Sequence, residues 1–164
     1  MKKVLLMVVA LLLLGGCSFK VGKNTVLILD NGSKPSTEEA NKVLDLSGKN
    51  LTKVDVSIFD QTNLEELNLS SNNLIDALPS QIGKLKDLKI LNVSNNQMTG
   101  VPAEIGQLIN LEVLDLSNNQ LTGLPNELAN LKNLKTLNLS GNEYSEKDFE
   151  SIRNSLPNVD YILE

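Results

Sequence analysis

The single cysteine is the most reactive side chain in this sequence. Cys17 is the only cysteine, and histidine is absent from the 164 residues. An intrachain disulfide is therefore impossible, and neither an imidazole base nor a histidine-ligated metal site can form. A lone cysteine can still be a nucleophile, half of an intermolecular disulfide, an inert core residue or a point of attachment.

Serines and carboxylates recur at regular positions, but their pattern does not favour catalysis. Five similar stretches carry a serine at the same place, namely Ser47, Ser70, Ser94, Ser117 and Ser140. No base accompanies these serines to activate a hydroxyl. Asp45 and Asp115 lie in stretches that, as strands of one sheet, would be about 14 Å apart, too far for paired acid–base chemistry. We therefore expect no catalytic residue, no cofactor and no metal, and the chain is predicted not to be an enzyme.

The charge balance argues against nucleic acid as a partner. The formal net charge is −5, from 15 basic and 20 acidic side chains. Removal of Lys2 and Lys3 with the N-terminus would leave 13 basic and 20 acidic side chains, a net charge of −7. A domain of that sign has no electrostatic attraction to phosphate backbones or to anionic lipid.

The first sixteen residues have the pattern of a secretory signal. Lys2 and Lys3 precede an unbroken apolar run from Val4 to Leu14, and Gly15 and Gly16 follow it. A helix of this run would rise about 16 Å, roughly half the hydrocarbon thickness of a bilayer. The run is therefore interpreted as the hydrophobic region of a signal peptide over residues 1–16, not as a permanent span.

The four residues Leu14-Gly15-Gly16-Cys17 resemble the lipobox of bacterial lipoproteins. The resemblance implies that the Cys17 thiol takes a diacylglycerol and becomes the new N-terminus, while residues 17–24 form a lipidated tether. The alternative is an ordinary secretory signal cut near Gly16. Acyl chains on Cys17 would hold the protein on a bacterial membrane outside the cytoplasm. Ser18 after the cysteine resembles routing to the outer membrane if the host has one.

The rest of the chain is built from a repeat of about 23 residues. Equivalent leucines recur at intervals of 23, 24, 23 and 23 residues, at Leu44, Leu67, Leu91, Leu114 and Leu137. The spacing resembles the leucine-rich repeat written LxxLxLxxNxLxxLPxxIxxLxx, over residues 41–144. The resemblance implies an α/β fold, a short solenoid with a parallel concave sheet of about five to six strands. The predicted units are an N-terminal cap over 25–43, repeats over 44–144 and a C-terminal cap over 145–164.

Each column of the repeat has an expected structural role. Alternate residues such as Leu67 and Leu69 should point inward from a short strand. Proline should begin the short return helix, at Pro79, Pro102 and Pro125. Four asparagines should bond buried backbone where the chain leaves each strand, forming a ladder of Asn72, Asn96, Asn119 and Asn142.

The repeat has departures and ends that need their own account. Lys49 and Asp55 replace asparagine and proline in the first repeat, and repeat two has one extra residue near Ile75–Ala77. Exposed solenoid ends need covers. A strand over Thr25–Asp30 and a helix over Ser36–Lys42 are predicted to cover the first end. At the other end, Ser145 should cap a helix running to about Ser155, and one last short strand should include Tyr161.

The outward strand residues are the candidate binding surface. We expect a protein or glycan ligand on the concave face, on eight residues: Glu66, Asn68, Ile90, Asn92, Val113, Asp115, Thr136 and Asn138. At the strand edge the sign of charge alternates, and neighbours should pair, through Lys42, Glu65, Lys89, Glu112 and Lys135. The leading prediction is a monomeric, lipid-anchored binding module. The alternative is a structural envelope protein whose even faces serve stability or self-association.

Overall fold

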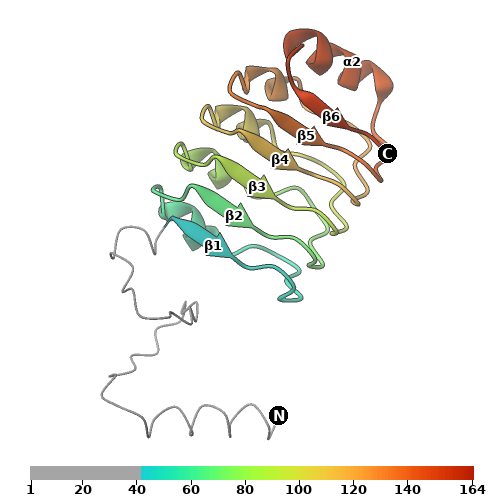
Figure 1. Cartoon of the computed structure of the whole chain (residues 1–164). Coiled ribbons are helices and arrows are strands. Elements are labelled where there is room, and N and C mark those ends of the chain that lie inside the picture. The colour runs from blue at the N-terminus through green and yellow to red at the C-terminus, as the bar shows by residue number, and fades with distance from the viewer. Residues whose placement is uncertain (1–41) are drawn as a thin grey trace, which may run out of the picture. The chain divides into compact units, whose positions relative to one another are not determined.

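The computed structural model describes residues 42–164, in which successive coils stack side by side (Figure 1). The signal peptide, Cys17, the tether and the part of the N-terminal cap predicted over 25–41 lie outside the described residues. Each of the first five coils contains one three-residue strand and a helix that returns the chain to the next strand. The strands are β1 Val43–Asp45, β2 Glu66–Asn68, β3 Ile90–Asn92, β4 Val113–Asp115, β5 Thr136–Asn138 and β6 Asp160–Ile162. The helices are η2 Val56–Asp60, η3 Ser80–Lys84, η4 Ala103–Gln107, η5 Asn126–Asn130 and α2 Glu146–Ser155.

The six strands form one parallel sheet in chain order, as the repeat predicts. The repeat sets the register, because equivalent leucines pair between neighbouring strands, Leu44 with Leu67 and Leu67 with Leu91. The middle residue of each strand points inward, and Leu67, Leu91 and Leu114 are at most 1% exposed. Because side chains alternate between the faces of a strand, the first and third residues of each strand point outward.

Four short 3₁₀ helices, η2 to η5, form the opposite wall of the solenoid. Pro79, Pro102 and Pro125 hold the capping position of η3, η4 and η5, as predicted. Proline suits that place because its missing N–H is not needed there. The first repeat has Asp55 instead, and its carboxylate accepts a hydrogen bond from the Ser57 N–H at 2.9 Å. Asp55 is therefore a functional cap in a coil that the sequence marks as irregular.

The C-terminal cap has the predicted elements. Ser145 caps α2, and its hydroxyl accepts from the Asp148 N–H. Phe149 and Ile152 on α2 are buried and cover the last coil. The Phe149 ring packs edge-on against Tyr161 of β6, with ring centroids 5.3 Å apart. Apolar burial of this kind closes one end of a core that would otherwise be exposed.

Candidate functional site

The candidate surface is the outward side of the sheet, which we call the concave face. It consists of the first and third residues of the six strands: Val43, Asp45, Glu66, Asn68, Ile90, Asn92, Val113, Asp115, Thr136, Asn138, Asp160 and Ile162. Figure 1 shows this side of the sheet with the return helices behind it. Val43 at 51% and Ile162 at 40% exposure are large aliphatic residues in contact with solvent. The structure thus places the eight predicted binding residues on one continuous surface.

Apolar residues form the centre of the first column. Ile90 pairs in register with Val113, and both are half-buried between their strand neighbours. Glu66 precedes them on β2, and Thr136 follows on β5. A shallow aliphatic strip of this kind can contact apolar groups of a ligand, while the flanking polar residues fix its orientation.

The third residue of each of the first five strands is held in a local turn that sequence reasoning missed. The Asp115 carboxylate accepts the Ser117 N–H at 2.9 Å and the Ser117 hydroxyl at 2.6 Å. The same side-chain-to-backbone bond, an Asx-turn, recurs in each of the first five coils, from Ser47 to Asp45, Ser70 to Asn68, Ser94 to Asn92 and Ser140 to Asn138. The signal was the recurring Asp/Asn-x-Ser, because these side chains favour bonding backbone two residues on.

These turns change what the predicted binding residues can do. One side-chain oxygen of each aspartate or asparagine in the column is occupied by the serine N–H. The hydrogen bond from the Ser47 N–H also holds the pKa of Asp45 below its usual value. The serine column therefore serves the turn through its backbone N–H groups, and the hydroxyls of Ser117 and Ser140 bond the turn residue as well. The second carboxylate oxygen of Asp45 and of Asp115 remains available to a ligand.

The asparagine ladder lies directly beneath this surface. The Asn96 side-chain amide donates to the carbonyls of Leu69, Val93 and Ser94 at 3.0–3.1 Å, and its oxygen accepts from the Leu74 N–H. Asn72, Asn119 and Asn142 make equivalent bonds in their coils. Each amide joins two adjacent coils, because the Leu69 carbonyl and the Leu74 N–H both belong to the coil before Asn96. The ladder is thus structural and holds the strand ends in place.

The residue before each ladder asparagine, and before Lys49 at the same place in the first coil, has a left-handed backbone. Five coils share this conformation, with φ between 51° and 68°, at Gly48, Ser71, Asn95, Asn118 and Gly141. Glycine and asparagine tolerate it best, whereas serine does so at a cost. The turn after each of the first five strands therefore has a fixed form, which explains the Ser-Asn-Asn sequences at 94–96 and 117–119 and the Ser-Gly sequences at 47–48 and 140–141.

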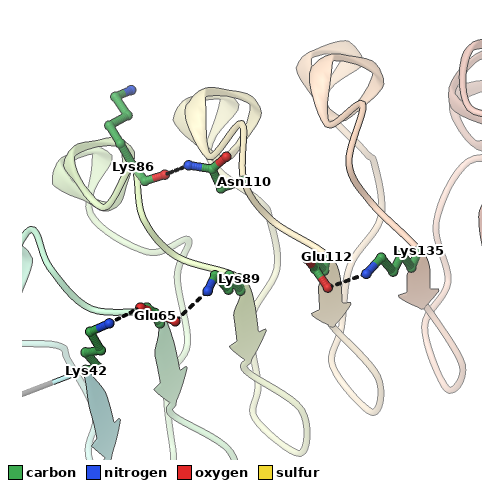
Figure 2. Close-up of polar contacts among 7 residues, drawn as sticks. All are labelled: Lys42, Glu65, Lys86, Lys89, Asn110, Glu112 and Lys135. Carbon is green, nitrogen blue, oxygen red and sulfur yellow. Dashed lines mark hydrogen bonds and ion pairs between the residues drawn. The ribbon is translucent and has the colours of Figure 1, made fainter. Parts of the chain in front are cut away.

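Charged residues along one edge of the concave face form an ion-pair ladder (Figure 2). Glu65 bonds Lys42 and Lys89, each at 2.6 Å, and Glu112 bonds Lys135 at 2.6 Å. The bond from Lys42, and then that from Lys89, lowers the pKa of Glu65 from 4.5 to about 2. The alternation of sign predicted pairing at every junction, but Lys89 and Glu112 are not paired with each other. Each instead bonds the neighbour on its other side.

A second contact between coils lies near the return helices. The Asn110 side-chain amide donates to the Lys86 carbonyl at 2.8 Å (Figure 2), and Asn133 makes the equivalent bond to Ile109. Ile109 itself is 58% exposed. Hydrogen bonds therefore join neighbouring coils on this wall, where the Ile109 side chain is exposed to solvent.

The extra residue of repeat two lies beside a groove on the flank of the solenoid. The groove has a volume of about 260 Å³ and is lined by the loops 52–56 and 74–79. Val56 and Ile75 are each about half exposed on its rim. Aliphatic side chains thus lie at the surface beside the extra residue, although none of them belongs to the concave face.

Within residues 42–164, no three histidine, cysteine, aspartate or glutamate side chains are placed to hold a metal ion. In the same range, no helix has the length and apolar character needed to cross a membrane. The Ser117 hydroxyl bonds the Asp115 carboxylate and the Ser140 hydroxyl bonds the Asn138 amide oxygen, both within Asx-turns.

Comparison with known proteins finds leucine-rich repeat proteins both by sequence family and by structure. A family model described as the leucine-rich repeat region matches residues 36–163. A leucine-rich repeat protein of Leptospira interrogans is 40% identical, with a TM-score of 0.69, and the match covers 77% of this chain and 33% of that protein. This chain thus spans about a third of the length of the Leptospira protein. No curated protein matches this chain.

Two plant receptors are also similar in structure. The ectodomain of the receptor kinase SOBIR1 from Arabidopsis thaliana is 33% identical, with a TM-score of 0.60, covering 73% of this chain and 66% of that one. The plant peptide hormone receptor RGFR1, in complex with RGF2, is 28% identical, with a TM-score of 0.57, covering 68% of this chain and 18% of that one.

Proposed function

Because this chain belongs to the leucine-rich repeat family, we propose that it is a membrane-anchored interaction module, held by lipid on Cys17 and binding a polypeptide on its concave face. The leucine-rich repeat fold indicates a protein-interaction module, and proteins of this family generally bind without catalysis. The anchor, the site outside the cytoplasm and the ligand are the parts that we propose.

The observation that carries the binding role is the uncovered sheet face. Ile90 and Val113 lie side by side at its centre, and Val43 and Ile162 are solvent-exposed at its two ends. A sheet face that carries aliphatic residues and has no covering layer among residues 42–164 is suited to contact with another molecule. The complex of the similar receptor RGFR1 with RGF2 makes a polypeptide the favoured ligand class.

The anchoring role is supported by the N-terminal sequence. Two lysines, an eleven-residue apolar run and Leu14-Gly15-Gly16-Cys17 occur in the order found in lipoprotein signals. The repeats offer Cys17 neither a second thiol nor a histidine. Attachment is therefore the role that fits this thiol, and two or more acyl chains hold a protein stably on a membrane.

The anchor is tested by metabolic labelling with a fatty acid in the bacterial host. The wild-type chain should incorporate label and sediment with membranes. Cys17→Ala should lose the label, whereas Ser18→Ala, its matched control, should keep it. Label retained in Cys17→Ala would refute lipidation at this residue.

The binding face is tested by photo-crosslinking from the anchored full-length chain. A photoreactive residue at Ile90 or Val113 should capture a polypeptide that the same group at Ile109, on the opposite wall, does not. Ile90→Arg with Val113→Arg should remove this adduct. If arginine along the column leaves every adduct and phenotype unchanged while Cys17→Ala abolishes function, the concave face is not the binding surface.

A further inference from the structure

The concave face carries acidic side chains and no basic ones. Its twelve residues include four carboxylates, Asp45, Glu66, Asp115 and Asp160. Lysine and arginine are absent from this set, so the face has a charge of −4 when all four are ionised. The remaining positions are amides, one threonine and aliphatic residues. Surface charge of one sign on a binding face selects the charge of the partner.

The edge lysines do not neutralise this face, although Lys49 lies close enough to Asp45 to add to the Ser47 hydrogen bonds that lower the pKa of that carboxyl. Lys42 and Lys89 bond Glu65, and Lys135 bonds Glu112, so these edge lysines are engaged by edge carboxylates. Among the described residues, none of the four carboxylates on the face takes part in an ion pair. Their charge is therefore presented to solvent beside the aliphatic pair Ile90 and Val113.

The spacing of the carboxylates suggests the form of the partner. Glu66, Asp115 and Asp160 stand on β2, β4 and β6, two strands apart in each step. Strands in a sheet are about 4.8 Å apart, so each step measures about 10 Å across the strands. Because Asp115 is the third residue of its strand while Glu66 and Asp160 are first residues, each step also shifts by about 7 Å along the strands. A polyproline II segment repeats every three residues with a rise of about 3.1 Å each, or about 9 Å per turn. The rise per turn matches the step across the strands, and the long side chains of lysine or arginine at every third position can span the shift along the strands to reach successive carboxylates.

From this complementarity we propose that the polypeptide bound on the concave face is a cationic, extended segment with lysine or arginine at every third position. The proposal rests on the proposed binding function and names its partner class. The apolar residues between the basic ones contact Ile90 and Val113. The basic side chains pair with Glu66, with the free oxygen of Asp115 and with Asp160, while Asp45, one strand from Glu66, adds to the negative charge of the face.

The Asx-turn makes a clean test possible. Asparagine already closes this turn at positions 68, 92 and 138, as aspartate does at 45 and 115. Exchange of aspartate and asparagine therefore changes the charge of the face while keeping the backbone bond. One variant neutralises the face through Asp45→Asn, Glu66→Gln, Asp115→Asn and Asp160→Asn. Its matched control removes four exposed carboxylates elsewhere, through Asp76→Asn, Asp87→Asn, Glu127→Gln and Glu143→Gln.

The probe is a synthetic peptide of repeated Lys-Pro-Pro, titrated against the full-length chain, with repeated Glu-Pro-Pro as the charge-reversed probe. The lysine peptide should bind the wild-type chain and the matched control alike, and salt should weaken this binding. The neutralised face should bind about tenfold more weakly or worse. Asn68→Asp, Asn92→Asp and Asn138→Asp together should tighten binding.

Several results would overturn the proposal. These are absent binding of the lysine peptide, equal binding of the glutamate peptide, or equal losses in the neutralised face and its matched control. The crosslinking from Ile90 and Val113 separates this failure from that of the broader function. If an adduct at these positions still forms after the face is neutralised, the concave face binds a ligand, but that ligand is not cationic. If no adduct forms at these positions, the proposed binding on the concave face is itself refuted.

Discussion

Asn119 and Met98 are joined across adjacent coils by a hydrogen bond of 3.0 Å, from the Met98 N–H to the side-chain oxygen of Asn119. The Asn119 amide nitrogen donates to three carbonyls, those of Val93, Leu116 and Ser117, at 3.0–3.1 Å. One nearly buried side chain therefore satisfies four backbone groups that the strand-to-loop turn would leave unpaired.

Asn119→Asp should destabilise the fold strongly. The substitution keeps the shape and the acceptor oxygen but removes all three donated bonds and places a carboxylate among carbonyl oxygens. Each unsatisfied buried group costs about 1–3 kcal/mol, so we expect the free energy of unfolding to fall by about 3–5 kcal/mol. Urea denaturation measures it. Gln120→Glu makes the same chemical change on an exposed neighbour and should change stability by less than about 0.5 kcal/mol. Equal effects of the two substitutions would contradict the structural role of the ladder.

Gly106→Ala should destabilise the fold more than Gly83→Ala. A Cβ at Gly106 would lie 2.8 Å from the backbone carbonyl carbon of Glu127 and closer still to its oxygen. A Cβ at Gly83 would instead meet the end of the Gln107 side chain at 2.9 Å, which can move aside. We expect a loss of about 2 kcal/mol or more at Gly106 and clearly less at Gly83. Thermal and urea unfolding compare the two, and the reverse order would show that η4 and η5 are not this closely packed.

Ser71→Gly should stabilise the fold. Ser71 has φ of 56°, a conformation that glycine adopts without steric cost. We expect a gain of about 0.5–1 kcal/mol, and a smaller gain for Ser71→Asn, the residue found at positions 95 and 118. Ser70→Gly is the control for this effect. Ser70 has no positive φ, so glycine at this position should lower the stability of the fold. A loss of stability in Ser71→Gly would be incompatible with the left-handed turn.

Glu65→Gln should remove a part of the stability that depends on pH. The lysines on both sides lower the pKa of Glu65 to about 2 in the folded state, from 4.5. The ionised carboxylate is thus favoured by folding, so its contribution is complete above about pH 4.5 and is lost as pH falls toward 2. The stability difference between wild type and Glu65→Gln, from urea unfolding at each pH, should therefore shrink over that window.

Salt and a neighbouring residue provide the controls for this pH dependence. The ion pairs are exposed, so added salt should reduce the difference at neutral pH. Glu66→Gln changes the adjacent residue, which makes no ion pair among residues 42–164, and should not reproduce the effect. A difference that stays constant from pH 5 to pH 2 would exclude the proposed role of Lys42 and Lys89.

Sequence reasoning predicted the fold in detail because every coil repeats the same constraints. Leucine spacing gives the strand positions and their register, proline marks the start of η3 to η5, and Ser145 marks the start of α2. These features depend on residues close together in sequence. The 3₁₀ helix of the first repeat shows the limit, since Asp55 replaces proline there and still caps it.

What sequence reasoning missed depends on contacts between coils or on backbone geometry. The close approach of Gly106 to Glu127 joins residues of different repeats, and no local pattern reports its distance. Glu112 pairs with Lys135 and not with Lys89. This depends on side-chain geometry, which the alternation of charge along the edge does not determine. The Asx-turns were accessible from the recurring Asp/Asn-x-Ser, but that motif was interpreted as a row of outward side chains.

The Asx-turn also allows the surface charge to change without a change in the backbone turn, although single substitutions usually affect both. Asp115 and Asn92 close the same turn in neighbouring coils with bonds of 2.9 Å. An exchange of one for the other therefore alters the surface by a full unit of charge without opening the turn. Descendants of such a repeat can accumulate these exchanges coil by coil, so ligand preference can diverge between lineages while the fold is inherited unchanged.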